Sequence, residues 1–226
     1  MTDEPTGQTA AGAGASDATV GPGPTTTGPG DVQRAYSLLS QLYIERLGSM
    51  EIVHHDDLRL IERHLGSVDG PVLDAGCGPG HLTGFLDSIG CEVSGVDLVP
   101  EFVAHARQAH PGVQFEVESL TDASRPDSSL AGVLAWYSLI HLDPDQLDAA
   151  MPAIRRVVAP DGTVVVGFFE GPVREAFDHK VISAYRWPVD EIASRLAAAG
   201  FVEVERLQRG HEGERRPHAV LVARAV

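Results

Sequence analysis

The sequence is short of basic side chains, and of lysine above all. Its 226 residues include 17 Lys and Arg against 32 Asp and Glu, which gives a net charge of −15, and Lys180 is the single lysine. Proteins that bind nucleic acids usually present a basic patch that neutralises phosphates. The basic clusters here are Arg155-Arg156 and the stretch 206–216, which two glutamates dilute. A nucleic-acid substrate is therefore disfavoured.

Cysteines and long apolar runs are scarce as well. Cys77 and Cys91 are too few for a disulfide framework, and we expect both to be small buried residues. No apolar run is long enough to cross a bilayer. The first residues, Met1 to Pro5, lack the basic and apolar regions of a secretory signal. These absences favour a cytoplasmic protein without a membrane span.

Large apolar side chains are nearly absent from residues 1–30, which are rich in Gly, Ala, Thr and Pro. Such a segment cannot bury enough surface to offset its conformational entropy, so we expect a disordered tail. From Asp31 on, apolar residues recur at helical spacing, and a second helix is predicted from about Glu51 to Leu65. The length favours one domain, over residues 31–226.

Beyond these helices the apolar pattern alternates between strands and helices. Strands are predicted near 71–75, 91–97, 113–117, 131–136 and 163–169, and helices near 80–89, 100–109 and 144–158. A helix over 188–199 and strands near 201–207 and 218–224 follow. The alternation predicts an α/β fold with a doubly wound, mostly parallel seven-stranded sheet. Because the last two strands have no helix between them, they should form an antiparallel edge hairpin.

The segment from Val72 to Gly80, VLDAGCGPG, predicts a buried strand that turns sharply into a helix. Glycines there let a ligand approach the backbone. A nicotinamide or flavin site would place a third glycine where His81 stands, so a dinucleotide is disfavoured. Asp97, 21 residues after Gly76, ends the next strand, where an acid can accept hydrogen bonds from ribose hydroxyls.

Taken in order, these segments resemble the class I S-adenosylmethionine-dependent methyltransferases. The resemblance covers residues 31–226 and implies a Rossmann-like fold, with residues 31–66 as a helical lid and S-adenosylmethionine as the cofactor that becomes S-adenosylhomocysteine. It rests on the glycine segment, Gly95-Val96-Asp97, the turn 159–162, Tyr36 and Tyr43 in the first helix, and the ending 198–201.

The resemblance also implies the residues that hold the cofactor. The glycine turn would contact its methionine part, Asp97 its ribose, and the segment after the third strand its adenine. A main-chain carbonyl at the end of the fourth strand would receive its amine. The implied cofactor residues are Tyr36, Tyr43, Asp74, Gly76, Cys77, Gly78, Asp97, Leu98, Glu118, Ser119, Leu120 and Trp136.

The acceptor of the methyl group should bind beyond the carboxyl ends of the strands. His141 lies just after the fourth strand, and its unperturbed pKa of ~6.5 suits a general base for an O–H, N–H or S–H acceptor. A purely structural role for His141 is an equal alternative. Core packing is the alternative for the other acceptor candidates, which are Tyr137, Phe168, His179, Tyr185 and Trp187.

Metal binding is not predicted. His54, His55, Asp56 and Asp57 follow one another in the second helix, where neighbours point about 100° apart, and a solvated helical face explains them better. The sequence thus predicts a methyltransferase for a small-molecule hydroxyl, amine or thiol. Two alternatives stay open, an NAD-dependent oxidoreductase and a non-catalytic S-adenosylmethionine-binding subunit.

Overall fold

A computed structural model describes residues 28–226 except 120–123, 212 and 214–215, so most of the expected tail lies outside the described residues. The first helix, α1 (Pro29–Leu47), begins two residues earlier than the sequence predicted. Pro29 fits a first helical turn, and the Asp31 carboxylate accepts a hydrogen bond from the Gly28 amide at 3.0 Å. The proline in the first turn and this hydrogen bond explain why α1 begins earlier than predicted.

The predicted helix over 51–65 is wrong in its first turn. A short 3-10 helix, Met50–Ile52, precedes α2 (His55–Leu65). His54 separates the two because its side chain caps α2, accepting a hydrogen bond from the Asp56 amide at 3.2 Å. The solvated face predicted for residues 54–57 is also wrong at one position, since Asp57 is 3% exposed.

The seven-stranded, mostly parallel sheet is confirmed, with strand order β3-β2-β1-β4-β5-β9-β8. The first five strands run parallel, whereas β9 pairs antiparallel with both β5 and β8, as predicted for the C-terminal hairpin. The strands are β1 (Val72–Ala75), β2 (Val93–Asp97), β3 (Gln114–Val117), β4 (Leu130–Trp136), β5 (Val158–Phe169), β8 (Phe201–Arg209) and β9 (His218–Ala225).

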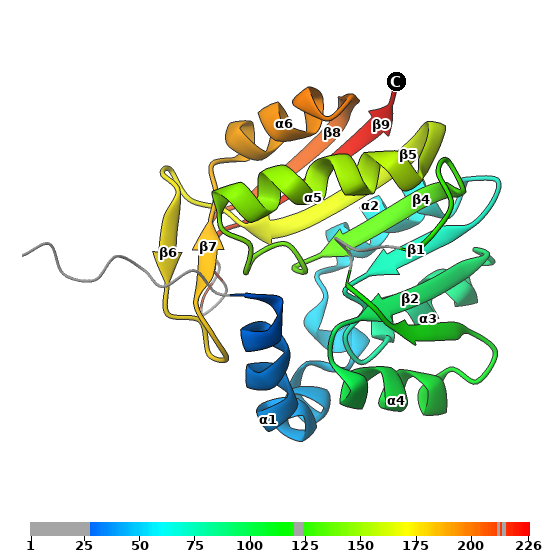
Figure 1. The fold of residues 1–226 in the computed structure, drawn as a ribbon, viewed down its shortest axis with the longest axis vertical. Helices are drawn as coiled ribbons and strands as arrows, with labels where there is room; N and C mark the ends of the chain where they lie inside the picture. The colour runs from blue at the N-terminus through cyan, green and yellow to red at the C-terminus, as the bar shows by residue number, and fades with distance from the viewer. Residues whose placement is uncertain (1–27, 120–123, 212, 214–215) are drawn as a thin grey trace, which may run out of the picture.

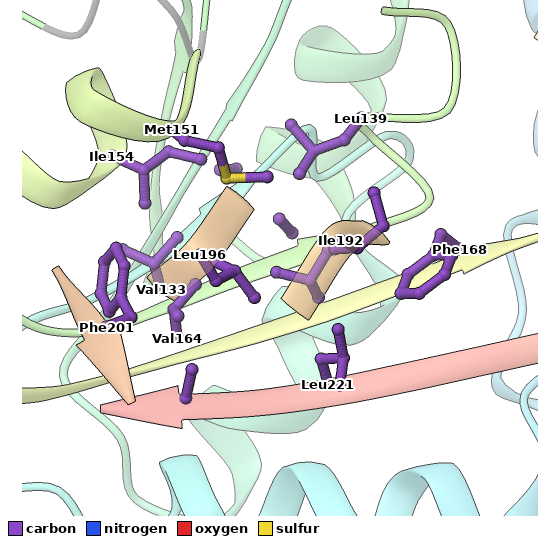
Figure 2. Close-up of a cluster of buried hydrophobic side chains, with 14 of the residues drawn as sticks. Val133, Leu139, Met151, Ile154, Val164, Phe168, Ile192, Leu196, Phe201 and Leu221 are labelled. Carbon is purple, nitrogen blue, oxygen red and sulfur yellow. The ribbon is translucent and has the colours of Figure 1, made fainter. Parts of the chain in front are cut away.

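Helices cover both faces of this sheet (Figure 1). The helices that follow α2 are α3 (His81–Ser88), α4 (Pro100–Ala109), α5 (Pro144–Val157) and α6 (Val189–Ala198). Successive strand residues point to opposite faces. Val133 and Val164 therefore pack under α5 and α6, whereas Leu134 and Val165 pack against α2 and α3. Figure 2 shows the first of these clusters, with side chains from α5 and α6 lying over β4, β5 and β9.

One pair of strands was not predicted. Strands β6 (Glu175–Phe177) and β7 (Ala184–Arg186) form a small antiparallel sheet inside the connection 170–187, which the sequence predicted as a loop. Each is three residues long, too short for a clear alternating pattern. This hairpin and α1 lie at the end of the sheet to which the parallel strands point (Figure 1). They therefore stand where doubly wound folds bind ligands.

Two smaller corrections concern single residues. Cys77 is buried as expected, whereas Cys91 is half-exposed because it precedes β2. The fifth strand begins at Val158 rather than 163, and Asp161 takes a left-handed backbone conformation (φ 61°) inside it. Among the described residues, no helix is both long and apolar enough to cross a membrane.

Candidate functional site

The glycine turn after β1 is held by the neighbouring strand. The amides of Gly76 and Cys77 both donate to the Val96 carbonyl, at 2.8 and 2.9 Å. Gly76 has φ 84°, and a Cβ there would come within 2.3 Å of the Ser138 Cβ, so a larger residue is excluded. A Cβ at Gly78 would meet nothing within 4 Å. The backbone of Gly76 and Cys77 is therefore held against β2, whereas Gly78 leaves room for a ligand.

Two carboxyl groups support this turn, one half-buried and one buried. Asp97 accepts hydrogen bonds from the amides of Gly78, at 2.8 Å, and Val99, at 2.9 Å. A carboxylate has about four acceptor sites, so Asp97 keeps capacity for ribose hydroxyls. Asp74 is 1% exposed and accepts from the Thr83 hydroxyl at 2.6 Å. Burial, together with the charge of Asp97, raises the pKa of Asp74 to about 7.

One pocket gathers most of the predicted cofactor residues with two of the predicted acceptor residues. Its walls come from α1, the glycine turn, the ends of β2 and β4, and α4. Sequence reasoning missed four of its residues, which are Val32, Val99, Phe102 and Ser138. The predicted residues that line it are Tyr36, Tyr43, Gly76, Gly78, Asp97, Leu98, Glu118, Trp136, Tyr137 and His141.

Tyr36 and Tyr43 close the pocket from α1. Their rings lie 5.4 Å apart, edge to face, and Tyr43 packs at 5.0 Å on Phe102 of α4. Burial raises the pKa of both hydroxyls, that of Tyr43 to about 12, with the charge of Asp97 adding to the effect. Both hydroxyls therefore stay protonated near neutral pH, and each can donate one hydrogen bond.

His141 faces Tyr36 in this pocket. Its Nδ1 lies 2.9 Å from the Ser183 carbonyl oxygen and its Nε2 lies 2.8 Å from the Tyr36 hydroxyl. A carbonyl can only accept, so Nδ1 carries the proton and Nε2 keeps its lone pair. Burial lowers the pKa of His141, although the bond to Ser183 opposes this. His141 is therefore a neutral proton acceptor at pH 7.

Aromatic side chains continue from His141 towards the β6–β7 hairpin. The centre of the His179 ring lies 5.7 Å from that of His141 and 5.8 Å from that of Phe169. The ring centres of Phe169 and Tyr137 lie 4.7 Å apart. Burial lowers the pKa of His179 to about 4, and His141 and nearby cations contribute. These rings form an apolar surface beside the pocket, in the region predicted for the acceptor.

Tyr137 itself begins a buried polar chain that sequence reasoning missed. Its hydroxyl is hydrogen-bonded to Nδ1 of His218, and Nε2 of His218 lies 3.4 Å from Asp57 Oδ1. The other oxygen of Asp57 pairs with Arg209 at 2.5 Å. Asp57, Tyr137 and His218 lie far apart in the sequence, so no local pattern could have revealed the cluster.

Several predicted residues lie elsewhere. Phe168 and Trp187 are 2% and 1% exposed in the hydrophobic core, which corrects their assignment to the acceptor pocket (Figure 2 shows Phe168). Tyr185 packs on Trp187 at 5.8 Å, and Cys77 joins the cluster beneath α4. Asp74, Cys77 and Ser119 do not line the pocket, although Asp74 supports its floor. Leu120 lies outside the described residues.

Two other places contain groups of titratable side chains. A hollow of about 360 Å³ between α3, α4 and the 3-10 helix is lined by His81, His105 and His110, and contains none of the predicted site residues. His54, His55 and Asp56 bring ligand atoms within 4.8 Å of one another. In that cluster His54 Nδ1 accepts a hydrogen bond from the Asp56 amide, and the His55 side chain is exposed.

Comparisons with known proteins identify related methyltransferases. The sequence profile of a methyltransferase domain matches residues 72–162. A 2-heptyl-1-hydroxyquinolin-4(1H)-one methyltransferase of Mycobacteroides abscessus is 30% identical over 161 residues, which cover 63% of this chain and 69% of that protein. A dTDP-3-amino-3,6-dideoxy-alpha-D-glucopyranose N,N-dimethyltransferase of Streptomyces fradiae is 31% identical over 148 residues, covering 64% of this chain and 55% of that protein.

A solved structure shares the fold over nearly the full length. It is a 1,6-didemethyltoxoflavin-N1-methyltransferase of Burkholderia thailandensis with bound 1,6-didemethyltoxoflavin and S-adenosylhomocysteine, and it has a TM-score of 0.75 and 23% identity. The alignment covers 91% of this chain and 92% of that one. The matches to the curated relatives span a smaller share of each relative's length than this structural alignment does. A malonyl-[acyl-carrier protein] O-methyltransferase of Enterobacter lignolyticus matches over 36% of its own length.

Proposed function

The chain belongs to the S-adenosylmethionine-dependent methyltransferases of class I, and we propose that it methylates a hydroxyl, amine or thiol of a small molecule with His141 as general base. One observation carries the proposal. Gly78 and Asp97, which can hold the cofactor, line the same pocket as His141, whose Nε2 can take a proton. We further propose that residues 31–226 form one domain, with residues 31–66 as its lid.

The residues of the pocket fit the cofactor. Gly78 leaves the backbone open to a ligand, Asp97 keeps free acceptor sites, and Leu98 and Phe102 offer an apolar surface suited to an adenine. S-adenosylmethionine, when bound, supplies a methyl group already activated by a positively charged sulfur. The protein then mainly aligns the two partners, which is worth about 7–11 kcal/mol of the barrier when the geometry is good.

His141 supplies the proton acceptor in this proposal. Its Nδ1–H is held by the Ser183 carbonyl, which fixes the ring and leaves the Nε2 lone pair for the acceptor's proton. In the structure that lone pair accepts the hydrogen of Tyr36. An entering acceptor therefore competes with the Tyr36 hydroxyl for the Nε2 lone pair of His141.

The relatives suggest which acceptors to test first. The Mycobacteroides abscessus and Streptomyces fradiae proteins are named for a hydroxyquinolinone and an amino sugar nucleotide. We expect turnover of labelled S-adenosylmethionine with an acceptor from a small-molecule library that starts with these two compounds. Failure of every acceptor, with S-adenosylhomocysteine still bound, would favour a non-catalytic binding subunit.

Cofactor identity has a separate test. S-adenosylhomocysteine at 100 times its dissociation constant should add about 2.7 kcal/mol to the free energy of unfolding, whereas NAD should add nothing. Thermal unfolding with each ligand measures the difference. Stabilisation by NAD alone would favour an oxidoreductase instead.

The role of His141 is tested by substitution. Because general bases contribute about 10²- to 10⁴-fold, His141→Ala should lower kcat at least 100-fold while S-adenosylhomocysteine binding changes less than about threefold. His55→Gln is the matched control, because His55 is exposed on α2 and away from the pocket. A wild-type kcat in His141→Ala would mean that catalysis depends on the alignment of cofactor and acceptor and needs no general base.

A further inference from the structure

Arg216 lies at the end of the sheet where the acceptor is expected to bind. Strand β9 pairs antiparallel with β5, and its first residue, His218, lies opposite Phe169. The Glu170 amide then donates to the Pro217 carbonyl at 3.0 Å. The residue before this contact, Arg216, therefore stands just past the carboxyl end of β5, on the side where doubly wound sheets bind ligands.

Two aromatic rings hold the half-buried Arg216 side chain. Its guanidinium carbon lies 4.5 Å from the ring centre of Phe177 and 5.7 Å from that of Phe169. Such contacts attract a cation to the face of a ring, and they engage none of its N–H groups in a hydrogen bond. Phe169 packs in turn on Tyr137, which lines the pocket. One ring therefore separates Arg216 from the pocket.

Arg216 differs from its neighbour Arg186 because no acid neutralises it. Arg186 lies 4.4 Å from the same phenylalanine ring and pairs with Glu175 at 3.1 Å. Glu170, at the end of β5, accepts a hydrogen bond from the Gln208 side chain. Within the described part of the chain, no carboxylate comes within 4.0 Å of the Arg216 guanidinium, and its N–H groups make no hydrogen bond. These N–H groups can therefore bind a ligand.

His179 is a second observation that points to a ligand in this place. Its ring centre lies 6.2 Å from that of Phe177. Its Nδ1 atom is buried and has no hydrogen-bond partner among the described residues. Burial lowers the pKa of His179 to about 4, and the charges of Arg216 and Lys180 contribute. Buried polar atoms in proteins are nearly always paired, so a polar group of a ligand is expected beside this neutral ring.

The two cations also stand out against the charge of the whole chain. The sequence has 32 acidic and 17 basic side chains, yet Arg216 and the single lysine, Lys180, both act on His179. A guanidinium presents its N–H groups as a fork that matches a carboxylate. We propose that Arg216 binds a carboxylate of the methyl acceptor, whose apolar body lies along Phe169 towards His141. This inference rests on the proposed function.

A structural tie between the start of β9 and the β6–β7 hairpin is the competing explanation for Arg216. It predicts that Arg216→Gln weakens every acceptor alike, whereas carboxylate binding predicts a loss for the anion alone. Arg224→Gln is the matched control, because it removes the same charge. Arg224 is exposed at the other end of β9, opposite Thr163, and does not line the pocket.

The test compares acceptor-like probes that differ only in one charged group. The pairs are 4-hydroxybenzoate with 4-hydroxybenzamide and 6-hydroxy-2-naphthoate with 6-hydroxy-2-naphthamide. Calorimetry measures their affinities for full-length protein saturated with S-adenosylhomocysteine. In at least one pair the carboxylate should bind about tenfold or more tightly than the amide, as for a hydrogen bond to a charged group. Arg216→Gln should abolish this preference by weakening the carboxylate alone, and Arg224→Gln should retain it.

Three outcomes would overturn the inference. They are equal affinity of carboxylate and amide in both pairs, no binding of any probe, and a preference that survives in Arg216→Gln. Equal weakening of both members of a pair in that variant would show a structural tie instead. If Arg216→Gln does not fold, Arg216→Lys decides, because it keeps the charge and loses the fork. It should bind the carboxylate more weakly than the wild type does and the amide equally well, and an unchanged carboxylate affinity would contradict the role of Arg216.

These measurements need no turnover, so they separate the two proposals. A protein that methylates acceptors but shows no preference for a carboxylate retains the proposed function and loses the role of Arg216. A protein with the preference but no methyl transfer retains Arg216 as an anion-binding residue and loses the proposed reaction.

Discussion

Asp97 holds two parts of the site at once, because its oxygens accept from the amides of Gly78 and Val99. An amide in its place would keep one accepting oxygen and turn an NH₂ group towards a backbone N–H. Asp97→Asn should therefore weaken S-adenosylhomocysteine binding at least tenfold and lower the melting temperature, as calorimetry and thermal unfolding would show. Asp87→Asn at the end of α3 should change neither, and near-normal binding by Asp97→Asn would remove Asp97 from the cofactor site.

Burial of His141 has a consequence for the pH profile. The active form is neutral, and burial lowers the pKa of the imidazole below its usual 6.5. As pH falls, protonation is therefore delayed, and the midpoint of the acid limb of kcat/KM should lie below pH 6.5. A profile of kcat/KM from pH 5 to 8 measures this, with unfolding curves at each pH as the control. An acid limb with its midpoint above pH 6.5 would exclude His141 as the base.

Residues next to a strand end could be predicted, whereas residues brought together by the fold could not. Gly78, Asp97 and His141 each lie at or just after the end of a strand, so the direction of the parallel strands placed them at one edge. Asp57 and His218 come from a helix start and a hairpin strand. Their apposition depends on how α2 packs beneath β9, which no local pattern encodes.

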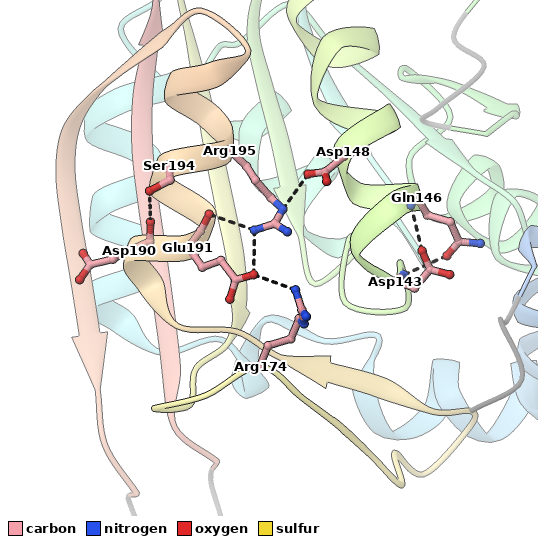
Figure 3. A network of polar contacts seen from close by, with 8 residues as sticks. All are labelled: Asp143, Gln146, Asp148, Arg174, Asp190, Glu191, Ser194 and Arg195. Atoms are coloured by element: carbon pink, nitrogen blue, oxygen red, sulfur yellow. Dashed lines mark hydrogen bonds and ion pairs between the residues drawn. The ribbon is translucent and has the colours of Figure 1, made fainter. Parts of the chain in front are cut away.

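At the scale of elements, Arg195 joins α6 to its neighbours. Its Nε lies 2.8 Å from Asp148 of α5, its Nη1 lies 2.9 Å from Glu191, and its guanidinium lies 4.9 Å from the ring centre of buried Trp187. Figure 3 shows this network, in which Glu191 also binds Arg174. The network fixes α6 against α5 and against the connection that leads to the β6–β7 hairpin.

Arg195→Met should lower the free energy of unfolding by about 1–3 kcal/mol, since the Arg195 side chain is 16% exposed and its removal leaves two acids with fewer partners. Denaturant unfolding measures the change. Arg34→Met is the control, because Arg34 and its partner Asp31 are 73% and 48% exposed and surface pairs contribute about 0–1 kcal/mol. Equal losses in both variants would contradict the role given to Arg195.

The three-residue elements were missed, whereas the strands and helices of four or more residues were predicted. The helix over residues 100–109 was predicted to the residue because Pro100 fits its first turn. The three-residue strands β6 and β7 gave no periodic signal, and Trp187, which follows them, entered the core through its contacts with α5 and α6. Hydrophobic patterning specifies which face an element buries, but a short segment takes its structure from its neighbours.

At the scale of the molecule, one sheet belongs to two cores. Leu134 of β4 is fully buried among side chains of α2 and α3, whereas Ile192 of α6 is 3% exposed on the opposite face. Residues that alternate along the same strands contribute to both clusters, so neither face can lose its packing without disturbing the strands that carry the other. The two layers should therefore unfold as one cooperative unit.

Leu134→Ala and Ile192→Ala test this coupling from opposite sides. Each should cost about 2–5 kcal/mol by leaving a cavity, and each should lower the midpoint of the same single transition. Far-UV and near-UV circular dichroism would follow it together. Val202→Ala is the control, because Val202 is 55% exposed on β8. Two separate transitions in either variant would mean that the α2–α3 layer and the α5–α6 layer fold independently, and that the pocket at the strand ends can form while one layer is unfolded.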